Sequence, residues 1–189
     1  MPLGQRPVAG RSAGATRSGL GGLAGVGLVI VGLVALGSGV GQADVGVSAR
    51  LEGGVGVHLP SGAALPQRNR PPSSGPQYAG RAAYGAFDSP VPPGDWVHVL
   101  EHGGVAVVFK CADATECGAT AGRIRTEVYD QAGNGAFGER KLVITPYQEM
   151  DSPIAAVAWG RILELHEIDA EQILAFYNRY LDRGPERAP

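Results

Sequence analysis

Apolar and polar residues follow three different patterns along this chain, and these patterns divide it into three parts. Residues 18–43 contain no charged side chain, and residues 20–36 are all Gly, Ala, Val, Leu or Ile. Residues 44–93 are interrupted by Pro and Gly every few positions, which denies them regular helix and most ladder hydrogen bonds. After residue 95, periodic apolar segments become readable, and these segments predict the folded core.

Three of the later segments have the composition of β-strands. Residues 104–109 form a short β-branched run, which is typical of a buried strand. Residues 141–145 form a second such run, which Pro146 ends. Residues 155–165 predict a third strand, broken or bent at Gly160.

Two further segments have helical spacing. Within residues 120–130, Ile124 and Val128 lie four positions apart, as on one face of a helix. Asp169 is the expected N-cap of a last helix, with Gln172 at the capping-box position. The apolar stripe of that helix comprises Ile173, Phe176, Tyr177, Tyr180 and Leu181.

The order strand, helix, strand, strand, helix predicts an α+β domain. We expect a small mixed sheet with two helices, covered on one face. The Pro- and Gly-rich part before it carries large aromatic side chains that are normally packed against a domain, namely Tyr78, Tyr84, Phe87 and Trp96. A long ordered loop region, preceded by an N-terminal transmembrane helix, therefore completes the expected architecture.

Residues 19–43 predict the membrane segment. A spanning helix needs about 20 apolar residues, whereas the apolar core of a secretory signal has roughly 7–15. The length favours an uncleaved anchor. Because Gly41, Gln42 and Ala43 also fit a cleavage site, the alternative is a secreted protein that is cut near Ala43.

The distribution of charge predicts which side of the membrane the domain occupies. Residues 1–18 contain three arginines and no acidic residue, and positive charge favours the cytoplasmic side. The expected order is a cytoplasmic basic tail over 1–18, an anchor or signal segment over 19–43, a linker over 44–55, and an extracytoplasmic domain over 56–186. With three of the 16 basic residues in the tail, the other 13 accompany 18 acidic ones, a formal charge of −5 that argues against nucleic acid as a partner.

Two cysteines lie in the part that is expected outside the membrane. Cys111 and Cys117 are separated by a short loop, and in an oxidising compartment such a pair normally closes as a disulfide. A metal or redox role is the alternative. The spacing is not C-x-x-C, which argues against a thioredoxin-like exchange site.

The sequence VHVLEHGGVAVVF at residues 97–109 contains the most unusual cluster of polar residues. On a helix, His98 and His102 share one face within about 6 Å, and with Glu101 they have the H-x-x-E-H order of inverted zinc peptidases. On a strand, four steps of roughly 3.3 Å set the two histidines about 13 Å apart, too far for one ion. The glycine pair that follows and the Pro-Pro-Gly that precedes leave room for at most a turn or two of helix.

Four blocks of the sequence share their order and approximate spacing with one protein family. The blocks are RPPSSGPQY at 70–78, VHVLEHGGVAVVF at 97–109, AVAWGR at 156–161 and RGPE at 183–186. Through them, about residues 56–186 resemble an uncharacterised bacterial family known as domain of unknown function 3105. The resemblance implies a single N-terminal membrane segment followed by an exported domain.

The family pattern also implies a set of histidines. His58, His98 and His102 match its positions, but Gln77 stands where the pattern has a further histidine, so a metal site would here be weakened or re-ligated. Neutral imidazole suits copper and zinc, and a thioether suits copper(I). The candidate metal ligands are therefore His58, His98 and His102, with Glu101, Gln77 and Met150 in supporting positions.

Three functional classes fit these observations. The leading hypothesis is a membrane-anchored extracytoplasmic domain of unknown activity that binds copper or zinc through its histidines. The alternative is a non-catalytic module of the cell envelope with an unidentified protein partner, in which the histidines form ordinary hydrogen bonds and Glu101 pairs with Arg161. A metal-dependent hydrolase using H-x-x-E-H is third, because no third ligand for it is evident, and the sequence leans against an enzyme.

Overall fold

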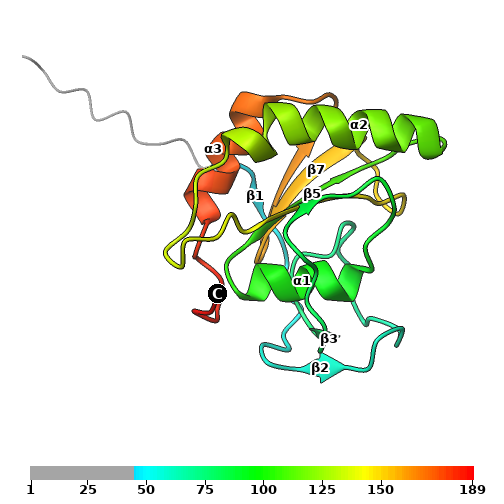
Figure 1. Ribbon diagram of the computed structural model, residues 1–189. Helices are drawn as coiled ribbons and strands as arrows, with labels where there is room; N and C mark the ends of the chain where they lie inside the picture. Colours follow the sequence, from blue (N-terminus) through cyan, green and yellow to red (C-terminus); the bar gives the residue numbers. More distant parts are fainter. Residues whose placement is uncertain (1–44) are drawn as a thin grey trace, which may run out of the picture. The chain divides into compact units, whose positions relative to one another are not determined.

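The computed structural model describes residues 45–189 (Figure 1). The predicted cytoplasmic tail and membrane segment, residues 1–18 and 19–43, lie outside the described residues. Within residues 45–189, no helix is both long enough and apolar enough to cross a membrane.

A six-stranded mixed sheet forms the centre of the domain, with the strand order β1-β8-β7-β5-β6-β4. The central strand β5 pairs in parallel with β6 and antiparallel with β7, and β7 pairs antiparallel with β8. The strands are β1 (Val47–Ser48), β4 (Gly85–Ala86), β5 (Val105–Phe109), β6 (Leu142–Pro146), β7 (Ile154–Ala158) and β8 (Arg161–Leu165). The predicted mixed sheet is therefore confirmed, and two of its edge pairings come from the loop region before residue 93.

The central strands lie where their composition requires. Every residue of β5, β6 and β7 is buried, as expected for continuous apolar runs in a sheet covered on both faces. The strands predicted at 104–109 and 141–145 are confirmed. The segment 155–165, predicted as one strand broken or bent at Gly160, is two strands, because the chain reverses at Trp159 and Gly160 to form the β7–β8 hairpin. Gly160 has φ +67°, a backbone conformation that glycine adopts without a side-chain clash.

Three α-helices cover the sheet, one more than the sequence predicts. Helix α2 (Ala114–Glu127) begins earlier than the expected residue 120, because the Asp113 carboxylate accepts a hydrogen bond from the Glu116 N–H. Helix α3 (Ala170–Tyr180) begins as predicted, with Asp169 accepting from the Gln172 N–H.

Helix α1 (Pro93–Glu101) is the helix that the sequence pattern misses. Its Pro-Pro-Gly start resembles a helix breaker, but proline is favourable at the first helical position, where the N–H has no partner in any case. Helix α1 lies on the face of the sheet opposite to α2 and α3 (Figure 1). The sheet is therefore covered on both faces, not on one as predicted.

The loop region before α1 is ordered and packed, as predicted. Tyr78 and Trp96 are buried, and Tyr84 and Phe87 pack against the apolar cluster between α1 and the sheet. Two short strands of this region, β2 (His58–Leu59) and β3 (Gln77–Tyr78), pair in parallel as a separate sheet, and β3 lies against α1 (Figure 1). This arrangement places the block 70–78 against α1, whose end belongs to the block 97–109.

Candidate metal centre

The β2–β3 pair and the end of α1 together bring the three predicted histidines side by side. His58 and Gln77 are register partners in the parallel pair. His98 lies in the last turn of α1, and His102 is its C-cap. The ring centroids of His58 and His98 are 4.8 Å apart, and those of His98 and His102 are 4.7 Å apart.

Glu101, the last residue of α1, is a buried carboxylate at the centre of this cluster. Its side chain is 0% exposed, and its Oε1 accepts a hydrogen bond of 2.7 Å from the Gly56 N–H. Its Oε2 accepts one of 2.5 Å from Gln77 Nε2, and His58 Nε2 lies 3.9 Å from the same oxygen. The arginine expected as its partner, Arg161, donates to Ser48 Oγ instead. Neutral donors and an imidazole therefore surround a carboxylate that a cation would stabilise.

The orientation of His98 leaves one ring nitrogen available to a ligand. Its Nδ1 lies 2.9 Å from the Tyr78 carbonyl oxygen and 3.2 Å from that of Gly80. Because a carbonyl only accepts, Nδ1 carries the proton, and Nε2 of the neutral ring keeps its lone pair. Histidines that ligate metals commonly have this second hydrogen bond, which fixes the tautomer and the ring orientation.

His102 has a different set of neighbours. Its Nε2 lies 3.4 Å from Glu186 Oε2, and its Nδ1 lies 3.3 Å from the Pro189 carbonyl oxygen. Arg81 Nη1 also lies 3.3 Å from that Nδ1. Burial lowers the pKa of His102, and His98 and Arg81 lower it further, against the raising effects of the Pro189 carbonyl and Glu186.

The candidate ligand atoms fall into two groups that share Glu101. Those of His58, His98 and Glu101 lie within 4.8 Å of one another, and so do those of Glu101, His102 and Glu186. The predicted three-histidine set is therefore divided, and Glu101 moves from a supporting position to the centre. Open zinc sites typically have three protein ligands of these types, with ligand atoms about 3.3–3.6 Å apart at tetrahedral angles. The limit of 4.8 Å in both groups is wider than this spacing.

The other predicted residues have clear positions. Gln77 is fully buried, and its Oε1 has no hydrogen-bond partner, so it is an unsatisfied acceptor within the cluster. Met150 is 4% exposed and packs in the apolar cluster around Trp96, which makes it a core residue. Cys111 and Cys117 form the predicted disulfide.

A comparison with known families places this site in context. Residues 58–189 match the family described as "Protein of unknown function (DUF3105)". The chain belongs to this family. The resemblance drawn from the four sequence blocks is thereby confirmed, and the DUF3105 match includes every candidate ligand from His58 to Glu186. No curated protein and no solved structure matches the chain.

Glu186 is the candidate ligand that the sequence reasoning misses, although it lies in the DUF3105 block RGPE. The C-terminal segment, residues 182–189, carries it to α1: the Asp182 N–H donates to the Gly103 carbonyl at 2.7 Å, and the Glu186 N–H donates to the Glu101 carbonyl at 3.0 Å. Gly184 lies directly against the Glu101 carbonyl, where any Cβ would collide with it. The small residue in this block is therefore required by the close approach of two backbone segments.

The buried Lys141 side chain binds the C-terminal segment through its ammonium group. Its side chain is fully buried, and its Nζ lies 2.8 Å from Asp182 Oδ1. The same ammonium donates to the His102 carbonyl at 3.0 Å and to the Ala188 carbonyl at 2.5 Å. One buried charge thus connects the end of α1 with the segment that carries Glu186.

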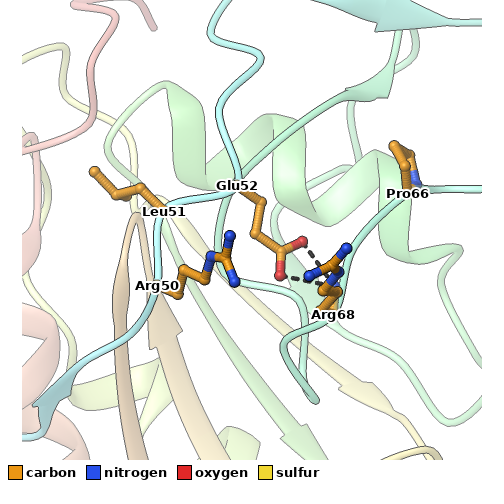
Figure 2. A pocket seen from close by; sticks show the side chains of 5 residues that line it. All are labelled: Arg50, Leu51, Glu52, Pro66 and Arg68. Atoms are coloured by element: carbon orange, nitrogen blue, oxygen red, sulfur yellow. Dashed lines mark hydrogen bonds between the residues drawn. The ribbon is translucent and has the colours of Figure 1, made fainter.

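A separate hollow is lined by other residues of the loop region. Figure 2 shows the Glu52 carboxylate beside Arg68, with the Arg50 guanidinium close by. The carboxylate accepts hydrogen bonds of 2.7 Å from the Arg68 N–H and 2.9 Å from the Asn69 N–H, so it holds the loop together. The cluster around Glu101 therefore remains the candidate metal centre.

Proposed function

We propose that this DUF3105 protein is a membrane-anchored extracytoplasmic domain that binds a transition metal, zinc or copper(II), through His58, His98 and Glu101. The burial of Glu101 is the observation that carries the proposal. Removing an ionised carboxylate from water is costly unless a counter-charge compensates it. A divalent cation held between this carboxylate and two neutral imidazoles would supply that charge.

The available donor atoms favour zinc or copper(II) over copper(I). The first group offers two imidazole nitrogens and one carboxylate oxygen, which suit both of the divalent ions. The soft donors considered from sequence are engaged elsewhere, since Cys111 and Cys117 are bonded to each other and Met150 is in the core. The unpartnered Oε1 of Gln77 supplies one more oxygen next to the carboxylate.

The exposure of the ligands provides a route for the ion. The His58 side chain is 39% exposed, whereas His98 is buried and Glu101 fully so. His58 would therefore be the ligand that a solvated ion meets first. A coordination position left for water or a further ligand is typical of sites with three protein ligands.

Two observations support the proposed location. The charge-free segment 18–43 has the length of a membrane anchor, with arginines on its N-terminal side. The disulfide is typical of an oxidising compartment outside the cytoplasm. External protease should therefore digest residues 45–189 in intact spheroplasts, and full protection of this part would contradict the proposed location.

The same geometry gives less support to a hydrolase. In the H-x-x-E-H mechanism the glutamate acts as a general base towards a metal-bound water. In the proposed site Glu101 is itself a metal ligand and not a free base, and the two histidines of the motif belong to different groups. An envelope interaction module without metal is the alternative that the binding experiment distinguishes.

The binding experiment measures zinc and copper(II) uptake by the full chain, purified in detergent and freed of metal by chelation. We expect stoichiometric uptake, with the tightest site lost in a His58→Ala/His98→Ala double variant. His166→Ala is the matched control, because His166 is exposed beyond the end of β8. A folded protein that takes up no metal would refute the proposal and favour the interaction module.

A further inference from the structure

We infer that Glu101, His102 and Glu186 form a second divalent-cation site, so that Glu101 bridges two ions in a binuclear centre. This inference rests on the proposed function, because the same carboxylate would serve both ions. The second group has one imidazole and two carboxylates, all with candidate ligand atoms within 4.8 Å of one another. His58 and His98 precede Glu101 in the sequence, whereas His102 and Glu186 follow it. Glu186 comes from the C-terminal segment.

The distance between His102 and Glu186 fits coordination of a common ion. Their Nε2 and Oε2 atoms are 3.4 Å apart. An N–H···O hydrogen bond is normally about 2.7–3.2 Å long. Two ligand atoms bound to one tetrahedral ion at about 2.0–2.2 Å are separated by about 3.3–3.6 Å. The observed separation therefore matches two ligands of one ion better than a direct hydrogen bond.

The other ring nitrogen of His102 supports the same geometry. When its Nδ1 donates to the Pro189 carbonyl, 3.3 Å away, the Nε2 lone pair faces the Glu186 carboxylate oxygen. In this tautomer two acceptors face each other, and a cation between them removes their repulsion. In the other tautomer Nδ1 accepts from Arg81 and Nε2 donates to Glu186, which is the arrangement without a metal. Arg81 lies on the Nδ1 side of the ring, away from this gap, and its positive charge would weaken binding of a second ion.

The shared position of Glu101 determines the type of centre. Carboxylates with two oxygens can place two ions about 3.5–4 Å apart, as in binuclear metal sites. Each oxygen of Glu101 has one donor at present, Gly56 N–H on Oε1 and Gln77 Nε2 on Oε2. The fully buried Oε1 of Gln77, which has no partner, lies next to this carboxylate and could turn towards an ion in either group.

The two sites would differ in exchange rate and in preferred metal. The His102 and Glu186 side chains are 16% and 39% exposed, so the second ion would be the more accessible one. Two carboxylates and one imidazole suit zinc, manganese(II) or iron(II). With Arg81 close by, we expect the second ion to bind at least tenfold more weakly than the first.

The test is a titration of the metal-free full chain in detergent with Zn²⁺ and, as a spectroscopic probe, Co²⁺. We expect two equivalents with separable dissociation constants. Glu186→Gln and His102→Gln should each weaken the second equivalent at least tenfold and leave the first unchanged, whereas Glu101→Gln should weaken both. Glu164→Gln, at an exposed position of β8, is the control and should bind like the wild type.

The outcomes separate this inference from the proposed function. Uptake of one equivalent, lost in His98→Ala but unchanged in folded Glu186→Gln and His102→Gln variants, would overturn the second site alone. In that case a proton, not a metal ion, joins His102 to Glu186. No uptake by the wild type would overturn both proposals. A thermal unfolding curve for each variant shows that a loss of binding is not a loss of folding.

Discussion

Replacing Lys141 by methionine should strongly destabilise the domain. Methionine keeps the length and most of the volume of the side chain but removes the ammonium. The ammonium is fully buried and serves three acceptors, the Asp182 carboxylate and the carbonyls of His102 and Ala188. Without it, these three oxygens lose their buried charged donor at once.

The structure sets the size of the expected effect. Removing one partner of a buried ion pair costs about 3–5 kcal/mol, because the other charge is left uncompensated. The Asp182 carboxylate keeps a hydrogen bond of 2.6 Å from the Ala136 N–H and is 21% exposed, so the lower end of this range applies. A loss of about 3 kcal/mol in a domain of this size lowers Tm by roughly 6–12 °C.

Thermal unfolding of the full chain, followed by near-UV circular dichroism, measures this shift. Lys110→Met is the matched control, because Lys110 is only partly buried and makes a single long contact of 3.3 Å with the Asp151 carbonyl. We expect the control to change the free energy of unfolding by about 0.5 kcal/mol or less. A Lys141→Met protein that melts within 2 °C of the wild type would refute the assigned role of this residue.

Three further predictions concern the same domain. Gly184→Ala should cost about 1–3 kcal/mol in urea unfolding through the backbone collision, whereas Gly122→Ala, with open space around its Cβ, should not destabilise the protein. Burial raises the pKa of Asp182, but hydrogen bonds from the buried ammonium and a backbone N–H outweigh it, so the net pKa is lowered. The stability from this carboxylate is therefore complete above about pH 5 and is lost as the pH falls further, and Asp182→Asn should flatten that acid-side loss in an unfolding series against pH. Reduction of the Cys111–Cys117 bond, which closes a short loop, should lower stability by about 2 kcal/mol, and complete unfolding on reduction would contradict this.

Those parts of the fold that depend on local pattern are predictable from the sequence. The strands β5 and β6 follow from unbroken apolar runs, and α3 follows from the Asp169 cap and its apolar stripe. The missed helix and the missed turn also have local causes. Helix α1 is hidden by prolines that are favourable at a helix start, and the β7–β8 turn is marked only by Gly160.

The candidate site depends on contacts that no local pattern contains. His58 lies beside His98 because β2 pairs with β3 and β3 packs on α1. In that pairing the partner of His58 is Gln77, 19 residues later in the chain. Glu186 reaches His102 because Lys141 and Gly184 fix the C-terminal segment against α1. Met150 is a candidate that the structure removes. Its expected position in a loop suggested a supporting ligand, but the side chain is buried in the core.

X-ray absorption spectroscopy of the zinc-loaded or copper-loaded protein tests the central claim, a metal bound by imidazole and carboxylate groups, most directly. We expect nitrogen or oxygen neighbours at about 2.0–2.2 Å, with the outer-shell scattering of at least two imidazoles in wild-type protein and a reduced imidazole signal in His98→Ala. A sulfur neighbour at about 2.3 Å, or a first shell without imidazole, would contradict the proposed ligand set of His58, His98 and Glu101.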